Sequence, residues 1–275
     1  MDWSKAKNII LVLLILLNIF LFINVMNVKN SFIVTGQYQR SAKQALEAAG
    51  VIVTGTIPNS DEPLNRISYI EKEPKEFQKI INMLTEKDYS DASYSENPIF
   101  ENEGKTLRLN KDTFNYTDKT GMTTFDVEDE KKTNKQILSW IKKNGLESKD
   151  FSLNSYVREG NSTTVEYIQK YNGMPLFSNK IIFSIEDGML IRVEGSIKVF
   201  YNIKLSKQKD EIVSPNIILL TNQDKVKGVI SSIVLGYLRP KDEELFDIPI
   251  WQINFHSGAE TYFNAYTGEW IDLPQ

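Results

Sequence analysis

The first thirty residues hold the feature that most constrains this chain. Positions 8–28, between Lys7 and Lys29, contain no charged residue, and positions 9–23 are apolar apart from Asn18. A helix over this stretch would be about 30 Å long at about 1.5 Å per residue, which matches the hydrocarbon core of a bilayer. No other stretch of the 275 residues is comparable. The pattern predicts a single transmembrane helix at residues 8–28, with the folded mass on one side of the membrane.

A cleavable secretory signal is the alternative explanation of this segment. Lys5 and Lys7 would suit such a signal, but residues 24–28 offer no pair of small residues for cleavage. The chain has no cysteine, so a lipid cannot be attached through one. We therefore expect an uncleaved anchor. The two lysines favour a cytoplasmic tail at residues 1–7 and an extracytoplasmic remainder at the cell membrane.

The charge of this remainder narrows the classes of partner. Without residues 1–29, which hold three lysines and one aspartate, the chain has 29 basic and 35 acidic side chains, a net charge of −6. An acidic surface disfavours binding to nucleic acid and to anionic membrane surfaces. Aromatic residues make up 11% of the chain, which is typical of globular material rather than disorder.

The pattern of apolar residues and turns predicts an α+β fold. Helices are expected at residues 35–49 and 74–87. A pattern typical of β-hairpins follows at 105–127, and a densely charged run lies at 126–132. We place a boundary in that run, which gives an N-terminal extracytoplasmic subdomain at 29–128 and a C-terminal one at 129–275.

The C-terminal subdomain shows helix-then-meander order twice. A helix is predicted from the capping box Thr133-x-x-Gln136 to Asn144-Gly145. Turns at Asn172-Gly173 and Asp187-Gly188 separate strands that follow it. Strands are expected at 163–171, 181–186, 189–194 and 197–205. A second helix is expected near 222–229, and strands follow it at 233–237, 249–255, 262–266 and 269–271.

No set of residues with catalytic spacing is evident. His256 is the single histidine and is expected to be a strand-end or turn residue rather than a base. One histidine without cysteine gives too few ligands for a usual zinc site, and no phosphate-binding glycine loop is present. We therefore predict no catalytic residues, no cofactor and no metal. A catalytic pair of the glycosidase type remains an alternative, and its candidate carboxylates are Glu71, Glu73, Asp126, Glu128, Asp129 and Glu130.

The large aromatic residues and Asn18 each have a structural and a functional explanation. We expect five aromatic side chains to belong to the core, and the alternative is that they line a ligand groove: Trp140, Trp251, Trp270, Tyr237 and Phe263. Asn18 is a polar amide inside the anchor. Such an amide commonly bonds to another transmembrane helix, so Asn18 is the candidate partner-binding residue.

Four segments resemble the YycI (WalI) family of accessory regulators. They are the start Met1-Asp2-Trp3-Ser4-Lys5-x-Lys7, the helix end Ala45-Leu46-x-Ala48-x-Gly50-Val51, the strand pair Tyr167-x-Gln169-x-Tyr171-Asn172-Gly173-x-Pro175-Leu176-Phe177 and Pro249-x-Trp251-x-Ile253. The resemblance extends over the full length. The two helix-plus-meander units also resemble those of PepSY-type extracytoplasmic domains.

The resemblance implies a non-enzymatic, single-pass regulator of an essential cell-wall two-component system (YycFG, also WalRK). Its partners would be a YycH-like sister protein and the sensor histidine kinase (YycG, also WalK), contacted through transmembrane helices. Two alternatives remain open from the residues alone. One is an anchored module that binds peptides or wall fragments, and the other is a cell-envelope hydrolase.

Overall fold

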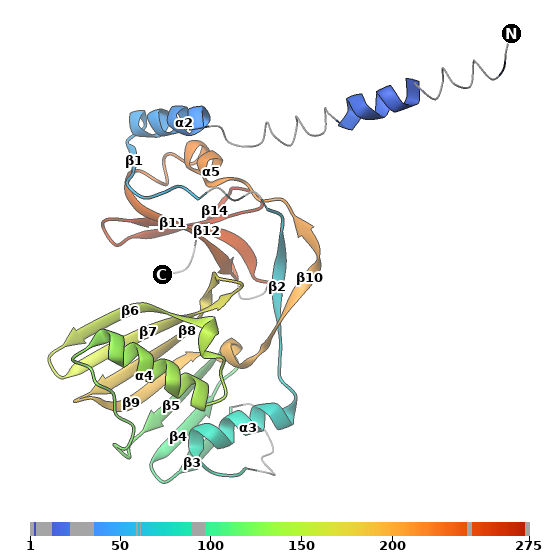
Figure 1. Ribbon diagram of the computed structural model, residues 1–275. Helices are drawn as coiled ribbons and strands as arrows, with labels where there is room; N and C mark the ends of the chain where they lie inside the picture. The colour runs from blue at the N-terminus through green and yellow to red at the C-terminus, as the bar shows by residue number, and fades with distance from the viewer. Residues whose placement is uncertain are drawn as a thin grey trace.

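The computed structural model describes residue 3 and residues 13–22, 36–58, 60, 62–89, 97–240 and 244–272. Within these residues, twelve strands join into one sheet, and two further strands form a separate antiparallel ribbon. Helices pack on the sheet at several places (Figure 1). The fold is therefore α+β, as the sequence predicts.

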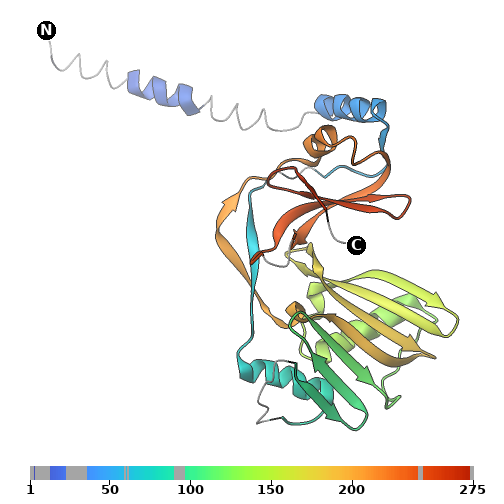
Figure 2. The same ribbon diagram turned by 180° about the vertical axis from the view of Figure 1, so that it is seen from behind.

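The larger part, here called the central unit, has helices on one face of an antiparallel sheet. Ile80, Ile81 and Leu84 of one helix and Ile137 and Ile141 of the other enter its apolar core. The strands lie in front of these helices when seen from behind (Figure 2). Its elements are α3 (Pro74–Thr85), β3 (Ile99–Asn102), β4 (Lys105–Leu109), β5 (Thr113–Asp118), α4 (Glu130–Lys143), β6 (Phe151–Glu159), β7 (Ser162–Tyr171), β8 (Met174–Glu186), β9 (Met189–Ser196) and the 3-10 helices η1 (Ser148–Asp150) and η2 (Ile197–Phe200).

The second part, here called the terminal unit, joins the start of the folded region to its end. Leu46 packs in one core with Ile218, Trp251 and Phe263, which come from the last third of the chain. Its elements are α2 (Gly36–Ala48), β1 (Val51–Val53), α5 (Pro215–Thr221), β11 (Gly228–Leu238), β12 (Ile248–Phe255), β13 (Glu260–Asn264) and β14 (Trp270–Ile271). Strand β1 pairs with β11 in parallel, so the segment that follows α2 is fixed to the C-terminal meander.

Strand pairing and the ribbon both link the units. Tyr237 of β11 pairs in parallel with Leu176 at the start of β8. The ribbon, formed by β2 (Leu64–Ile70) and β10 (Asn202–Asp210), runs along the side of the molecule between the units (Figure 1). The helix-then-meander order is present twice, as α4 before β6–β9 and α5 before β11–β14.

The predicted β-turns agree closely with the structure. Asn172 and Gly173 have φ of 49° and 83°, and Asp187 and Gly188 have φ of 50° and 77°. Two consecutive positive φ values are the geometry of a type I′ hairpin turn. Each turn connects consecutive antiparallel strands, so both hairpin predictions are confirmed.

Three predictions of local structure are wrong. Helix α4 begins at Glu130 instead of after Thr133, because the side chain of Asp129 accepts from the backbone N–H groups of Lys131 and Lys132 and caps it earlier. Positions 197–205 do not form one strand, since 197–200 is the 3-10 helix η2 and β10 starts at Asn202.

The third error concerns the helix predicted near 222–229. The actual helix, α5, begins at Pro215, a favoured first position, and ends at Thr221. Strand β11 already begins at Gly228.

The predicted subdomains at 29–128 and 129–275 contribute strands to the same sheet path. Strand β5 pairs with β9 over five residue pairs, and β1 pairs with β11. The boundary at 128/129 stays a prediction.

Candidate functional site

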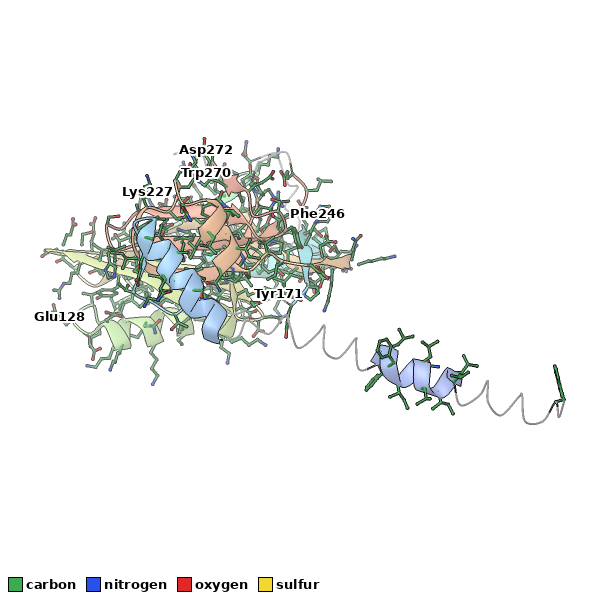
Figure 3. All side chains as sticks on the ribbon, turned by 90° about the horizontal axis from the view of Figure 1, so that it is seen from above. Glu128, Tyr171, Lys227, Phe246, Trp270 and Asp272 are labelled. Carbon is green, nitrogen blue, oxygen red and sulfur yellow. The ribbon has the colours of Figure 1, made fainter. Side chains whose placement is uncertain are left out.

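Part of the predicted anchor lies within the described residues. Residues 13–22 are helical, and their large apolar side chains are about half exposed or more, with 50% at Ile19 and 65% at Phe22. These side chains point outward around the helix (Figure 3). Among the described residues, no helix has the length and hydropathy needed to cross a membrane. The remaining positions of the predicted span, 8–12 and 23–28, lie outside the described residues.

Asn18 uses one of its hydrogen-bonding groups within this helix. Its side-chain Nδ2 donates to the backbone oxygen of Leu14, one turn earlier, at 2.8 Å. A carboxamide has a second N–H and an acceptor oxygen. Within the described residues neither of these has a partner. The predicted contact of Asn18 with another transmembrane helix stays a prediction.

Four of the five aromatic residues that the sequence singles out belong to the core or pack against it. Tyr237, Trp251 and Phe263 are at most 2% exposed. Trp140 packs on the ring of Phe183, at 5.4 Å between ring centroids. The expectation that they are core residues is confirmed.

Trp270 is the exception among these aromatics. It is 40% exposed and lies at the surface of the terminal unit (Figure 3). Its Nε1 donates to Thr261 Oγ1 at 3.0 Å, and the ammonium group of Lys225 lies 4.4 Å from the ring centroid. Trp270 therefore has surface partners of its own, and the expectation that it is a core residue is wrong.

His256 lies directly after β12, as expected of a strand-end residue. Its backbone N–H donates to Val229 O, and its ring Nε2 lies 3.0 Å from Thr54 Oγ1. The Thr54 hydroxyl also donates to Ile230 O at 2.9 Å, so the His256 ring takes part in a local contact at the strand end.

The candidate carboxylates are divided between two places. Glu71 and Glu73 lie between β2 and α3, whereas the other four lie at the start of α4. Glu128 pairs with Arg158 at 2.5 Å and Asp126 with Lys132 at 3.2 Å. Within the described residues no cluster of metal-ligating side chains is present. Glu128 and Asp126 therefore take part in surface ion pairs, and Asp129 caps α4.

A cavity of about 510 Å³ lies where the ribbon meets the central unit. It is lined by the segment between β2 and α3, the turn between β4 and β5, and η2. Phe77, Leu109 and Ile197 give it apolar walls, and the last two are nearly fully buried. Its volume lies within the range of small-molecule sites, which are mostly apolar with a few polar groups.

The rim of this cavity is polar. Lys72 and Lys111 line it, and within the described residues neither forms an ion pair. Tyr201 donates to Glu71 Oε1 at 3.3 Å. Burial, followed by the charges of Glu71 and Asp112, raises the pKa of Tyr201 to about 12, so this hydroxyl stays protonated at neutral pH. The lining thus includes two lysines that form no ion pair with another described residue and one carboxylate that already accepts a hydrogen bond.

A buried polar junction joins the ribbon to the terminal unit. Asp247, which is fully buried, accepts from the Tyr69 hydroxyl at 2.7 Å and from Arg239 Nε at 3.2 Å. Its backbone exchanges two hydrogen bonds with Ile67 of β2, at 2.8 and 2.9 Å. Burial and then the Asp247 carboxylate raise the pKa of Tyr69 far above its usual value. Tyr69 therefore remains a donor to Asp247.

Sequence reasoning identifies neither the cavity nor this junction. Lys72 and Lys111 are 39 positions apart, and Tyr69 and Asp247 are 178 apart. Only the tertiary fold brings such residues together, and each one looks like an ordinary surface residue in its local sequence.

The comparisons with known proteins identify a family. The family model described as YycI protein matches residues 29–266. No curated protein matches the chain. The chain is similar in structure to an uncharacterized protein from Eubacterium rectale ATCC 33656, with a TM-score of 0.49 and 11% identity over 81% of this chain and 89% of that one. It is also similar to the Bacillus megaterium YpeB C-terminal domain, with a TM-score of 0.42 and 10% identity over 74% of this chain and 97% of that one. Because the family match covers most of the sequence, this chain belongs to the YycI family.

Proposed function

We propose that this chain is a non-enzymatic accessory regulator of the YycFG (WalRK) two-component system, held in the cell membrane by a single helix at residues 8–28. Its tail at 1–7 is cytoplasmic and the rest is extracytoplasmic. Its partners are the YycG-like sensor kinase and a YycH-like sister protein. The observation that carries the proposal is the family match over residues 29–266. The uncharged, apolar run before that match supports the anchor.

The proposed mechanism works through helix contacts in the membrane. A polar side chain in a transmembrane helix stabilises helix association by hydrogen bonding, by about 0.6–2 kcal/mol. Asn18 has one amide N–H and one oxygen left for such a bond. A regulator shifts a kinase between its signalling states only through its differential affinity for them. The proposal therefore requires the anchor to pack better against one state of the kinase than against the other.

Copurification from membranes tests the partnership. The full chain, affinity-tagged, is expected to retain the sensor kinase and the sister protein after mild solubilisation. Absence of both from the wild-type eluate would contradict the proposed function.

The substitution Asn18→Leu tests the polar contact separately. We expect the amount of copurified kinase to fall about three-fold or more, because about 0.6 kcal/mol already corresponds to nearly a three-fold change in affinity. Asn18→Gln keeps a carboxamide and is the matched control, expected to retain most of the association. Equal recovery of the kinase with the Asn18→Leu variant and with the wild-type chain would show that this residue is incidental.

One observation favours a binding role beside regulation. The cavity between the ribbon end and the central unit has the size and apolar lining of a ligand site. An anchored module that binds a small extracytoplasmic molecule is therefore the second candidate function. Among the residues that the structure describes, no comparable geometry supports a hydrolase. Turnover of wall polymer by the purified chain, abolished by a single carboxylate substitution, would favour the hydrolase over the binding module.

A further inference from the structure

The cavity at the end of the ribbon combines apolar walls with positive charge at its mouth. Phe77, Leu109 and Ile197 form the walls. Leu109 and Ile197 are 4% and 6% exposed and are therefore fixed parts of the core. Phe77 is held by its edge-on contact with Phe200, at 6.0 Å between ring centroids. The walls are thus anchored by packing, and the space between them is a feature of the folded unit.

The charged residues that line the cavity are unequal in sign. Lys72 and Lys111 contribute two ammonium groups and Glu71 one carboxylate. Asp112, whose charge also acts on Tyr201, is near the cavity without lining it. Glu71 accepts the Tyr201 hydroxyl, and within the described residues it forms no ion pair with either lysine. Among the described residues no ion pair of either lysine has to be broken before its ammonium group forms a charge-assisted hydrogen bond with an anion.

We propose that this cavity binds a small molecule that has a carboxylate on an apolar body. The apolar body occupies the space between Phe77, Leu109 and Ile197, and the carboxylate lies between Lys72 and Lys111. The free C-terminal residue of a short peptide and a short fatty acid share this chemistry. The site goes beyond the proposed regulation through the membrane and does not depend on it, because no residue of the anchor takes part.

The location of the cavity gives binding a structural consequence. Glu71 and Lys72 directly follow β2, and Tyr201 directly precedes β10, so both strands of the ribbon end at its mouth. Between its middle and this end the ribbon is held to the terminal unit through Asp247, which bonds to Ile67 and Tyr69 of β2. A ligand at the mouth therefore contacts both strands that lead to the unit containing α2.

The test uses the full chain in lipid nanodiscs and two pairs of probes, with empty nanodiscs as the blank. One pair is N-acetyl-Ala-Leu with a free carboxylate and its C-terminal amide. The other is hexanoate and hexanamide. Binding is measured by isothermal titration calorimetry and by ligand-observed NMR. We expect at least one acid to bind about ten-fold more tightly than its amide, and the pair that shows it identifies the source of the ligand.

Variants assign the binding to the cavity. Lys72→Ala combined with Lys111→Ala is expected to weaken binding of the acid about ten-fold and to leave the amide unchanged. Lys119→Ala is the matched control, because Lys119 is an exposed lysine at the opposite end of β5 from Lys111. Circular dichroism confirms that each variant is folded.

Three results would overturn the proposal. They are no binding of either acid, equal affinity for acid and amide, or an unchanged affinity of the double variant. Kinase copurification is a separate readout, so failure of the cavity and failure of the proposed function are distinguishable.

Discussion

Trp251 is the largest fully buried side chain of the terminal unit, and its indole also has a specific polar contact. Its Nε1 donates to Val213 O at 2.9 Å. Trp251→Phe would leave that buried carbonyl without its partner, at a cost of about 1–3 kcal/mol, in addition to the lost packing. Urea unfolding followed by circular dichroism is expected to show this loss of stability.

Trp270→Phe is the matched control for Trp251→Phe. The indole of Trp270 also donates a hydrogen bond, but it is 40% exposed, so water replaces the lost partner. We expect Trp270→Phe to lower the free energy of unfolding by less than about 1 kcal/mol. Equal losses at the two positions would contradict the assignment of Trp251 to the core and of Trp270 to the surface.

Asp118 gives a pH dependence with a definite sign. Burial alone would raise the pKa of this carboxyl, but hydrogen bonds from Thr120 and Thr123 and the charge of Lys105 outweigh burial and lower the pKa. A carboxyl with a lowered folded pKa stabilises the protein above its unfolded pKa of about 3.9. That stabilisation is lost as the pH falls from about 4 through the folded pKa.

Asp118→Asn tests this account. At neutral pH we expect a loss of about 1–3 kcal/mol, because hydrogen bonds to a charged group are replaced by weaker ones. The gap between variant and wild type should close below about pH 4. Unfolding free energies measured between pH 3 and pH 7 provide the check, and a gap that stays constant over this range would be inconsistent with a lowered pKa.

At the scale of elements, short-range signals are reliable where one residue pair dictates the backbone. The turns at Asn172-Gly173 and Asp187-Gly188 are predicted correctly because few other residues tolerate two positive φ values in succession. Helix starts are less reliable, since Asp129 and Thr133 both suit a cap. Asp129 caps α4, whereas the Thr133 hydroxyl donates to Asp126 O and Asp129 O.

The ribbon depends on the buried junction at Asp247. Tyr69→Phe removes one hydrogen bond to its carboxylate and is expected to cost about 1–3 kcal/mol. Arg239→Ala leaves the fully buried Asp247 without its cation. Loss of one partner of a buried pair costs about 3–5 kcal/mol, and the partial exposure of Arg239 places this pair at the lower end.

Hydrogen exchange of β2 locates the effect of these two substitutions. Both variants should speed exchange of the β2 amides more than those of β7 in the central unit. Uniform changes across the chain would contradict a local role for the junction.

At the scale of the whole molecule, the sequence predicts the α+β class and the repeated helix-plus-meander order, because both depend on local patterns. It does not predict that β1 pairs with β11 or that β5 pairs with β9. Those contacts are set by tertiary packing between segments far apart in the chain. The cavity escapes sequence reasoning for the same reason, whereas Asn18 stands out because a lone amide in an apolar run is visible locally.

The attachment of the first folded helix also appears only at this scale. Helix α2 follows the proposed anchor in sequence, and its Leu46 is 1% exposed in the core of the terminal unit. The next strand, β1, is paired to β11. The start of the folded region is therefore fixed to strands from the C-terminal third of the chain.

The central claim is that the membrane segment regulates the kinase. The most direct measurement is kinase output, read from a promoter controlled by its response regulator, in cells that lack the native chain and express residues 1–30 fused to an unrelated extracytoplasmic domain. The account predicts that this chimera shifts the output in the same direction as the full chain, and that Asn18→Leu in the chimera reduces the shift. An output equal to that of cells without either protein would contradict regulation through the membrane segment.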